Sequence, residues 1–217
     1  MPVTDYLVRN AELYPDEVAL VELNPDEKDT RRTTWKEFDL IQPINNMPYR
    51  REITWSVFNE KANRFANMLL SRGVKKGDKV AILMYNCLEW LPIYFGVLKT
   101  GAIAVPFNFR YDSDEIYYCA ELAQVDVIVF GFAFIGRIEV NAERLSRGRL
   151  LIYVGDNCPS FAESYHELVA DCSSKEPDVK ITEDDYGAIY FSSGTTGFPK
   201  AILHKHQSLT QAAIMEQ

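Results

Sequence analysis

Six consecutive residues near the end of the chain are Ser, Gly or Thr, and a lysine follows shortly after them. Such a run cannot serve a hydrophobic core, because none of its side chains is strongly apolar. Its glycines let backbone N–H groups converge on one point, its hydroxyls add donors, and the lysine adds a positive charge. These groups suit a phosphate chain. A phosphate-binding loop is therefore predicted at Ser192-Ser193-Gly194-Thr195-Thr196-Gly197-Phe198-Pro199-Lys200.

The run differs from a Walker P-loop, whose last residues are Gly, Lys and then Ser or Thr. Counted from Gly194, the second glycine falls on Pro199 and the hydroxyl falls on Ala201. The Walker magnesium ligand is therefore missing, which argues against a P-loop ATPase or kinase. The alternative is a flexible Gly/Ser/Thr surface loop that binds no ligand. Apolar segments at 188–191 and 201–203 favour instead a loop that connects two buried strands.

The segment from Tyr190 to Ala201, followed by His206, closely resembles the phosphate-binding signature of the adenylate-forming enzymes. This superfamily includes acyl-CoA synthetases, luciferases and peptide-synthetase adenylation domains. Further similarity spans nearly the whole chain and looks most like the acid:CoA ligase branch. It lies in Pro15 to Leu20, Ile53 to Trp55, Gly77 to Ile82, Asn86 to Trp90, Gly101-Ala102 and Pro106 to Asn108.

The resemblance implies a reaction in two steps. A carboxylate attacks the α-phosphate of ATP to give an acyl-adenylate and pyrophosphate, and a thiol, usually that of CoA, then takes the acyl group. The implied ligands are ATP, Mg²⁺, CoA and a carboxylic acid such as a fatty acid. Lys200 and Thr196 are the implied catalytic residues. The implied nucleotide-binding residues are Ser192, Ser193, Gly194, Thr195, Thr196, Gly197, Lys200 and His206.

Several elements that the resemblance implies have no counterpart before Gln217. They are a Tyr-Gly-x-Thr-Glu motif whose Glu holds magnesium, an Asp that binds the ribose, a hinge and a C-terminal lysine. We therefore expect the N-terminal part of a longer AMP-forming acid:CoA ligase, inactive as a fragment. Two alternatives stay open: an adenylating enzyme that passes the acyl group to a carrier protein, and a truncated module that binds nucleotide or a partner without catalysis.

The composition argues against nucleic acid or an anionic membrane as the binding partner. The net charge is −8, whereas nucleic acid or an anionic membrane would favour a basic face, so small molecules are the expected partners. The apolar stretch 125–135 is too short to span a membrane. Cys87, Cys119, Cys158 and Cys172 lack the paired short spacing of a zinc site or a disulfide framework, which predicts reduced thiols of a cytoplasmic protein. The oligomeric state cannot be predicted.

Charged residues gather around the predicted loop. Lys200, His204, Lys205 and His206 would favour a polyanion locally, and a solvated strand end is the alternative. The acidic run 183–185 has the residue types of a metal site, but we interpret it as a solvated turn. No metal ligand is therefore predicted in this chain.

The first part of the chain predicts a helix capped by Thr4 that ends at Tyr14, before Pro15, and then a strand at 18–23. The pattern Arg-Arg, Thr-Trp and Phe in 31–38 occurs again in 50–58. Because a helix follows the second copy, we interpret 31–49 as an insertion; chance similarity is the alternative.

The remaining pattern alternates short apolar runs with amphipathic helices, which is typical of βαβ units and a parallel sheet. Ser56 is the predicted cap of a helix that buries Phe58, Ala62, Phe65, Ala66 and Leu69. Strands are predicted at 79–84, 102–105, 125–130 and 150–154, and helices at 88–100, 112–123, 137–145 and 161–171.

The predicted fold class is therefore α/β, with layered, mostly parallel sheets and flanking helices. The resemblance implies that this is part of the large N-terminal domain of an adenylate-forming enzyme. We divide the chain into an α/β subdomain at 1–180 and the start of a second subdomain at 181–217, which carries the phosphate-binding loop.

Overall fold

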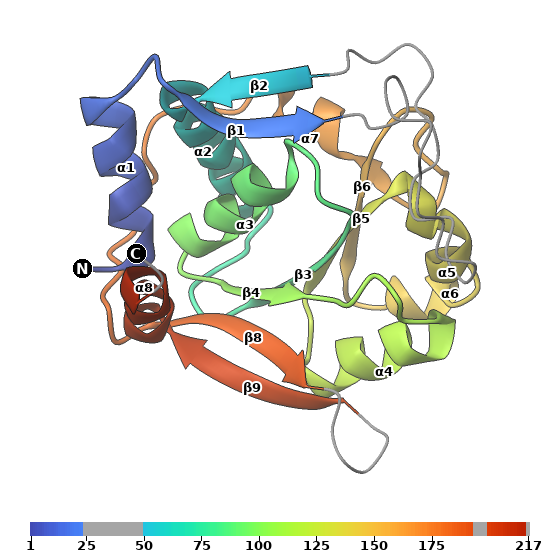
Figure 1. Ribbon diagram of the computed structural model, residues 1–217. Coiled ribbons are helices and arrows are strands. Elements are labelled where there is room, and N and C mark those ends of the chain that lie inside the picture. Colours follow the sequence, from blue (N-terminus) through green and yellow to red (C-terminus); the bar gives the residue numbers. More distant parts are fainter. Residues whose placement is uncertain (24–49, 193–198, 216–217) are drawn as a thin grey trace, which may run out of the picture.

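The computed structural model describes residues 1–23, 50–192 and 199–215 (Figure 1). The predicted insertion at 31–49 lies outside the described residues. Seven strands form one sheet, in the order β7-β6-β5-β3-β4-β8-β9, and β1 and β2 form a separate antiparallel pair. The strands are β1 (Val18–Leu23), β2 (Arg50–Thr54), β3 (Lys79–Leu83), β4 (Ile103–Pro106), β5 (Val127–Gly131), β6 (Leu150–Val154), β7 (Glu163–Ser164), β8 (Tyr186–Ser192) and β9 (Lys200–Lys205).

Helices cover both faces of the seven-stranded sheet (Figure 1). They are α1 (Val3–Leu13), α2 (Trp55–Ser71), α3 (Trp90–Lys99), α4 (Ser113–Leu122), α5 (Ile135–Glu139), α6 (Ala142–Leu145), α7 (Tyr165–Ala170) and α8 (His206–Met215). All pairings in the sheet are parallel except β8 with β9. The predicted α/β fold with a mostly parallel sheet is confirmed.

Alternation along β3 divides the core into two layers. Ala81 and Leu83 pack with α4, α5 and α6, whereas Val80 and Ile82 pack with α2, α3 and α7. This is the period of two that a strand buried on both faces requires. The five predicted apolar positions of α2 are all buried, as the helical spacing indicates.

The β1–β2 pair lies on the far side of α2 and α3 from the large sheet (Figure 1). Leu7 of α1 and Phe58 of α2 are buried beneath it, and Leu20 and Ile53 pack against them. The second copy of the repeated pattern, 50–58, forms strand β2 and the first turn of α2. The helix predicted to follow this copy is confirmed.

Two predicted caps are wrong. Thr4 lies inside α1 and is buried, and the residue before that helix is Pro2, which has no side-chain donor or acceptor. Thr54, rather than Ser56, caps α2 and accepts a hydrogen bond from the Val57 N–H at 3.4 Å. Helix α2 therefore begins one residue before the predicted cap. A Ser or Thr hydroxyl near the start of a helix often indicates the N-cap. Which hydroxyl caps the helix depends on which residue has extended backbone, and here that residue is Thr54.

Asp112 is the predicted cap of α4 and is confirmed. Its carboxylate accepts from the N–H groups of Asp114 and Glu115, and the Glu115 carboxylate accepts from the Asp112 N–H. This reciprocal capping box satisfies donors that the first turn leaves open.

Two predicted helices are shorter than expected. The segment 137–145 contains α5 and α6, separated at Val140 and Asn141. Asn141 is buried there, and its side-chain amide donates to the Ser113 carbonyl. The segment 161–171 begins with β7 and becomes helical only in α7. Asn141 between α5 and α6 bonds to Ser113, and β7 pairs with β6. The local pattern of apolar residues does not show either contact.

Candidate phosphate-binding hairpin

The predicted loop connects β8 to β9, which form an antiparallel hairpin. Ser192, the last residue of β8, pairs with Lys200, the first residue of β9. Since β8 runs parallel to β4, both residues lie at the carboxyl edge of the sheet, where α/β proteins bind ligands. The structure therefore brings Ser192 and Lys200 together at this edge. Ser193, Gly194, Thr195, Thr196 and Gly197 lie outside the described residues.

Aromatic rings pack against the end of β8, on one face of the sheet. Phe191 makes edge contacts with Phe107 and Tyr111, at centroid distances of 5.8 and 6.4 Å. Phe107 follows β4 directly, so these contacts join the ends of two neighbouring strands. The base of the loop is thus packed into the core on this face.

On the opposite face, α3 contacts β8 through two hydroxyls. The Tyr94 and Tyr190 oxygens lie 2.9 Å apart, and the Tyr94 ring stacks on Trp90. Burial raises the pKa of Tyr94, so its hydroxyl remains protonated and can donate. Tyr190 also makes an edge contact with His204 of β9. These contacts hold the strand that precedes the predicted loop against the core.

Lys200 is exposed, and its side-chain ammonium has no hydrogen bond or ion pair among the described residues. A cation at the end of a strand, beside a Ser hydroxyl and a Gly-rich segment, fits the donor set that a phosphate chain requires. The prediction that both flanking strands are buried is wrong for the second one. Ala201, Ile202 and Leu203 are exposed, because β9 is the edge strand of the described sheet.

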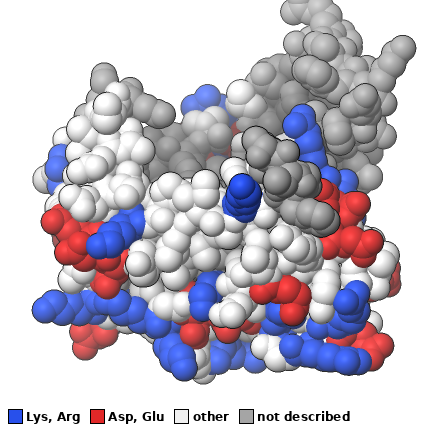
Figure 2. Space-filling view, turned by 90° about the horizontal axis from the view of Figure 1, so that it is seen from below, with Lys and Arg blue, Asp and Glu red and all other residues white. Residues whose placement is uncertain are grey.

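Seen from the side of β8 and β9, much of the visible surface is uncharged, a Lys or Arg side chain stands within this area, and most charged side chains lie toward the lower and outer margin (Figure 2). The exposed apolar side chains Tyr190, Ile202 and Leu203 come from this hairpin.

His206 lies away from Lys200. It begins α8, beyond the end of β9 that pairs with Tyr186, so about 17 Å of strand separates it from Lys200. Its ring is fully buried against Gly187, and both ring nitrogens lack a partner among the described residues. Burial lowers the pKa of His206. The structure thus does not bring His206 together with Lys200, and its contact with the nucleotide stays a prediction.

The other predicted charged residues are paired. The Lys205 ammonium lies 3.0 Å from the Asp184 carboxylate, and Lys76 lies 2.7 Å from Asp185. Glu183 pairs with the amino group of Met1. The acidic run 183–185 therefore joins three other segments. Of the two lysines in the basic cluster predicted around the loop, Lys205 has an ion-pair partner, and Lys200 has none among the described residues.

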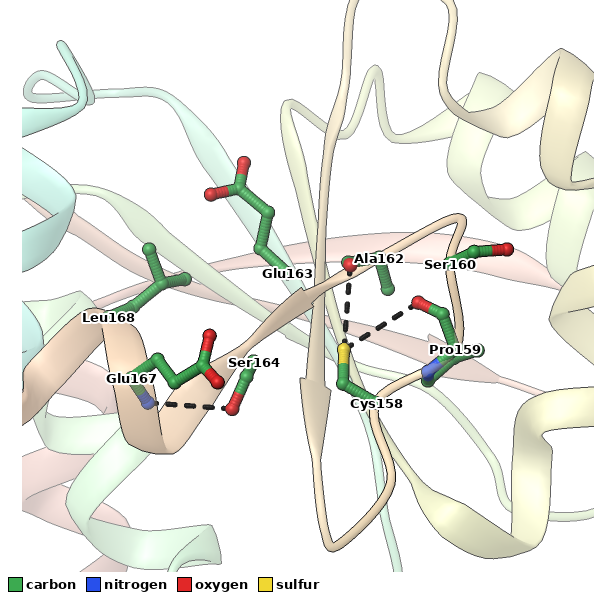
Figure 3. Close-up of a pocket in the computed structure, with 8 residues that line it drawn as sticks. All are labelled: Cys158, Pro159, Ser160, Ala162, Glu163, Ser164, Glu167 and Leu168. Carbon is green, nitrogen blue, oxygen red and sulfur yellow. Dashed lines mark hydrogen bonds between the residues drawn. The ribbon is translucent and has the colours of Figure 1, made fainter.

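A cavity of about 400 Å³ lies at the other end of the sheet (Figure 3). Its polar groups already serve local structure: the Cys158 thiol donates to the Ala162 carbonyl, and the Ser164 hydroxyl accepts from the Glu167 N–H. Glu163 pairs with Arg72. Since β7 and β9 are opposite edges of the sheet, this cavity is separate from the hairpin.

Comparison with known proteins identifies the family of the chain. The sequence profile described as "AMP-binding enzyme" matches residues 7–216, which is nearly the whole chain. The chain belongs to this AMP-binding enzyme family.

Related proteins are CoA ligases. Long-chain-fatty-acid–CoA ligase FadD13 of Mycobacterium tuberculosis is 33% identical over 162 residues, which cover 74% of this chain and 31% of that protein. The 3-hydroxybenzoate–CoA/4-hydroxybenzoate–CoA ligase of Thauera aromatica is 31% identical over 169 residues, covering 77% and 32%. The AMP-binding chain thus spans about a third of the length of these relatives.

The crystal structure of the anthranilate CoA ligase AuaEII in complex with anthranoyl-AMP superposes with a TM-score of 0.81 at 25% identity. The match covers 98% of this chain and 36% of that one. The fold described above is therefore the fold of the N-terminal part of an adenylate-forming enzyme. Within the described ranges, no helix has both the length and the apolar character needed to cross a membrane.

Proposed function

We propose that this chain supplies the phosphate-binding part of an ATP-dependent, AMP-forming acid:CoA ligase. The observation that carries the proposal is the hairpin that brings Ser192 and Lys200 together at the carboxyl edge of the sheet. ATP supplies the phosphate on which the acid is activated. In the proposal, Lys200 holds the β- and γ-phosphates, and Thr196 and the neighbouring Ser, Thr and Gly residues at 192–197 bind them through hydroxyl and N–H groups.

Small-molecule acid, ATP, Mg²⁺ and CoA are the proposed ligands. The names of the relatives support CoA as the acyl acceptor over a carrier protein, and fatty or aromatic acids as the acid. Mg²⁺ would accompany the phosphates, as it does in other phosphoryl and nucleotidyl sites. We also propose a cytoplasmic location, which four free cysteines support. The division into subdomains at 180 stays a prediction.

Lys200→Ala tests the central residue. A charge-assisted contact contributes roughly 1.5 to 3 kcal/mol, so the variant should bind MgATP about one to two decades more weakly. The measurement is an isothermal titration of the purified chain. Because Lys200 is exposed, its thermal unfolding midpoint should stay that of the wild type.

Lys205→Ala is the matched control, since Lys205 lies on the same strand and pairs with Asp184. It should leave the isotherm unchanged. An unchanged isotherm for Lys200→Ala would remove this lysine from the site. We further expect no acid-dependent ATP/pyrophosphate exchange by the chain alone; measurable exchange would show that it is a complete catalyst.

A further inference from the structure

The segment that leads into β8 is held along helix α2 by a row of side chains. Asn59, Asn63 and Asn67 stand four residues apart, so they share one face of the helix. Asn67 donates to the carbonyls of Ser173 and Lys175 at 2.7 and 2.9 Å. Asn63 donates to the Ser174 carbonyl at 3.0 Å. We call residues 172–176, held in this way, the strap.

The strap ends in an ionic contact between a buried ammonium and a half-exposed carboxylate. The Lys99 ammonium, 3% exposed, lies 2.6 Å from the Glu176 carboxylate and 2.7 Å from each of the side-chain oxygens of Asn59 and Asn63. Burial lowers the pKa of Lys99, and Glu176 opposes this shift. Burial alone would raise the pKa of Glu176, but hydrogen bonds from Lys99 and both amides outweigh it and lower that pKa. The buried ammonium is thus fully paired.

A second anchor lies directly before β8. The Asp185 carboxylate accepts from Lys76 at 2.7 Å and from the Thr182 N–H at 2.7 Å. The Asp185 carbonyl accepts from the His206 N–H at 2.9 Å, which also ties the start of α8 to this turn. The entry to β8 is therefore held both at Glu176 and at Asp185.

The ladder between β8 and the rest of the sheet is short by comparison. Strand β8 pairs with β4 at Ala104 and Ala188, whereas β3 and β4 pair from Lys79–Ile103 to Ile82–Pro106. A single bridged pair leaves the rest of β8 to be placed by packing and by contacts outside the ladder. Other contacts must therefore contribute to the position of the hairpin.

We propose that Lys99 and the asparagine row of α2 are positioning residues for the phosphate-binding hairpin. By holding the strap, they set where β8 enters the sheet and hence where Lys200 stands. The nucleotide part of this inference rests on the proposed function, but the positioning part does not. The role is indirect, because Lys99 lies at the end of α3, by the amino edge of the strands, far from Lys200.

Hydrogen exchange of the full 217-residue chain tests the positioning directly. In Lys99→Met, amides of β8 and β9 should exchange about tenfold faster, because loss of the strap lets the hairpin open locally. Amides of β5, in the middle of the sheet, should keep the wild-type rate. Equal acceleration in β5 would mean general destabilisation, and unchanged rates in β8 would mean no positioning; either result overturns the inference.

Two further variants cover the case in which Lys99→Met fails to fold. Asn67→Ala removes two bonds to the strap without leaving a buried charge, and should accelerate exchange of the hairpin about threefold. Glu176→Gln keeps an acceptor for Lys99 and should lie between wild type and Lys99→Met. Lys205→Met, the control, removes an exposed pair from the hairpin and should change nothing; equal acceleration there would overturn the role of the strap.

MgATP titration provides the second readout. Weaker binding by Lys99→Met, about threefold to tenfold, would support the link from the strap to Lys200. Faster exchange of the hairpin with unchanged affinity would overturn that link. If the wild-type chain binds no MgATP, the proposed function fails, while the exchange experiment still decides whether the strap positions the hairpin.

Discussion

The middle of the seven-stranded sheet and its β8–β9 end are built differently. Strand β5 is buried along its whole length and pairs with β3 and β6 through continuous parallel ladders. Strand β9 is an edge, exposed over most of its residues, and β8 has a short ladder to β4. The comparison separates two tasks: apolar burial around β5 supplies the stability of the fold, and the weakly paired end presents the polar groups that can bind a ligand.

The same substitution in β5 and in β9 should show the largest difference. Ile128 of β5 is fully buried and Ile202 of β9 is 47% exposed. Ile128→Ala leaves a cavity and should lower the free energy of unfolding by about 2 to 5 kcal/mol, whereas Ile202→Ala should cost about 0.5 kcal/mol. Urea unfolding monitored by tryptophan fluorescence measures both. Similar costs for the two variants would show that β9 is buried in solution and remove the contrast.

The second largest effect should be a pH dependence of stability caused by His206, at the β8–β9 end of the sheet. His206 is fully buried and its pKa is lowered by burial, so the folded chain resists a proton that the unfolded chain accepts near pH 6.5. The unfolded state thus binds more protons, and stability should fall as the pH falls from about 7 to 5, by at most about 1.4 kcal/mol per pH unit. Denaturant unfolding at a series of pH values measures this slope.

His206→Phe keeps a ring against Gly187 without a titratable group, so its stability should depend less on pH in this range. The lowered pKa values of Glu176 and Asp185 act only at more acidic pH, where their stabilisation is lost as the pH falls through those values. Equal slopes for wild type and variant would contradict the assignment to His206.

The region around β5 was predicted from the sequence better than the β8–β9 end of the sheet. Strand β6 was predicted at its observed bounds and Asp112 as the cap of α4, because both depend on neighbours in the chain. The antiparallel direction of β9 was not predicted, although the signal was present. Seven residues between Ser192 and Lys200 are too few for the crossover that a parallel strand requires.

Other features depend on segments that only the fold brings together. The asparagine row on α2 has the spacing of one helix face, but its partner is a strap more than a hundred residues away. Similarly, six residues of spacing could not show that His206 lies at the opposite end of the hairpin from Lys200. The residue types of the site were readable from the sequence, and their distances were not.

The smallest expected effect concerns the hydroxyl pair that joins α3 to β8. Tyr190→Phe leaves the nearly buried Tyr94 hydroxyl without its partner and should cost about 1 to 2 kcal/mol. Tyr94→Phe removes the buried hydroxyl and leaves that of Tyr190, which is partly exposed, to water, so it should cost about 0.5 kcal/mol. Chemical denaturation of both variants and of the double variant measures the asymmetry. Equal costs would mean that water reaches Tyr94 as easily as Tyr190, and that the weakly paired end of the sheet is open on both of its faces.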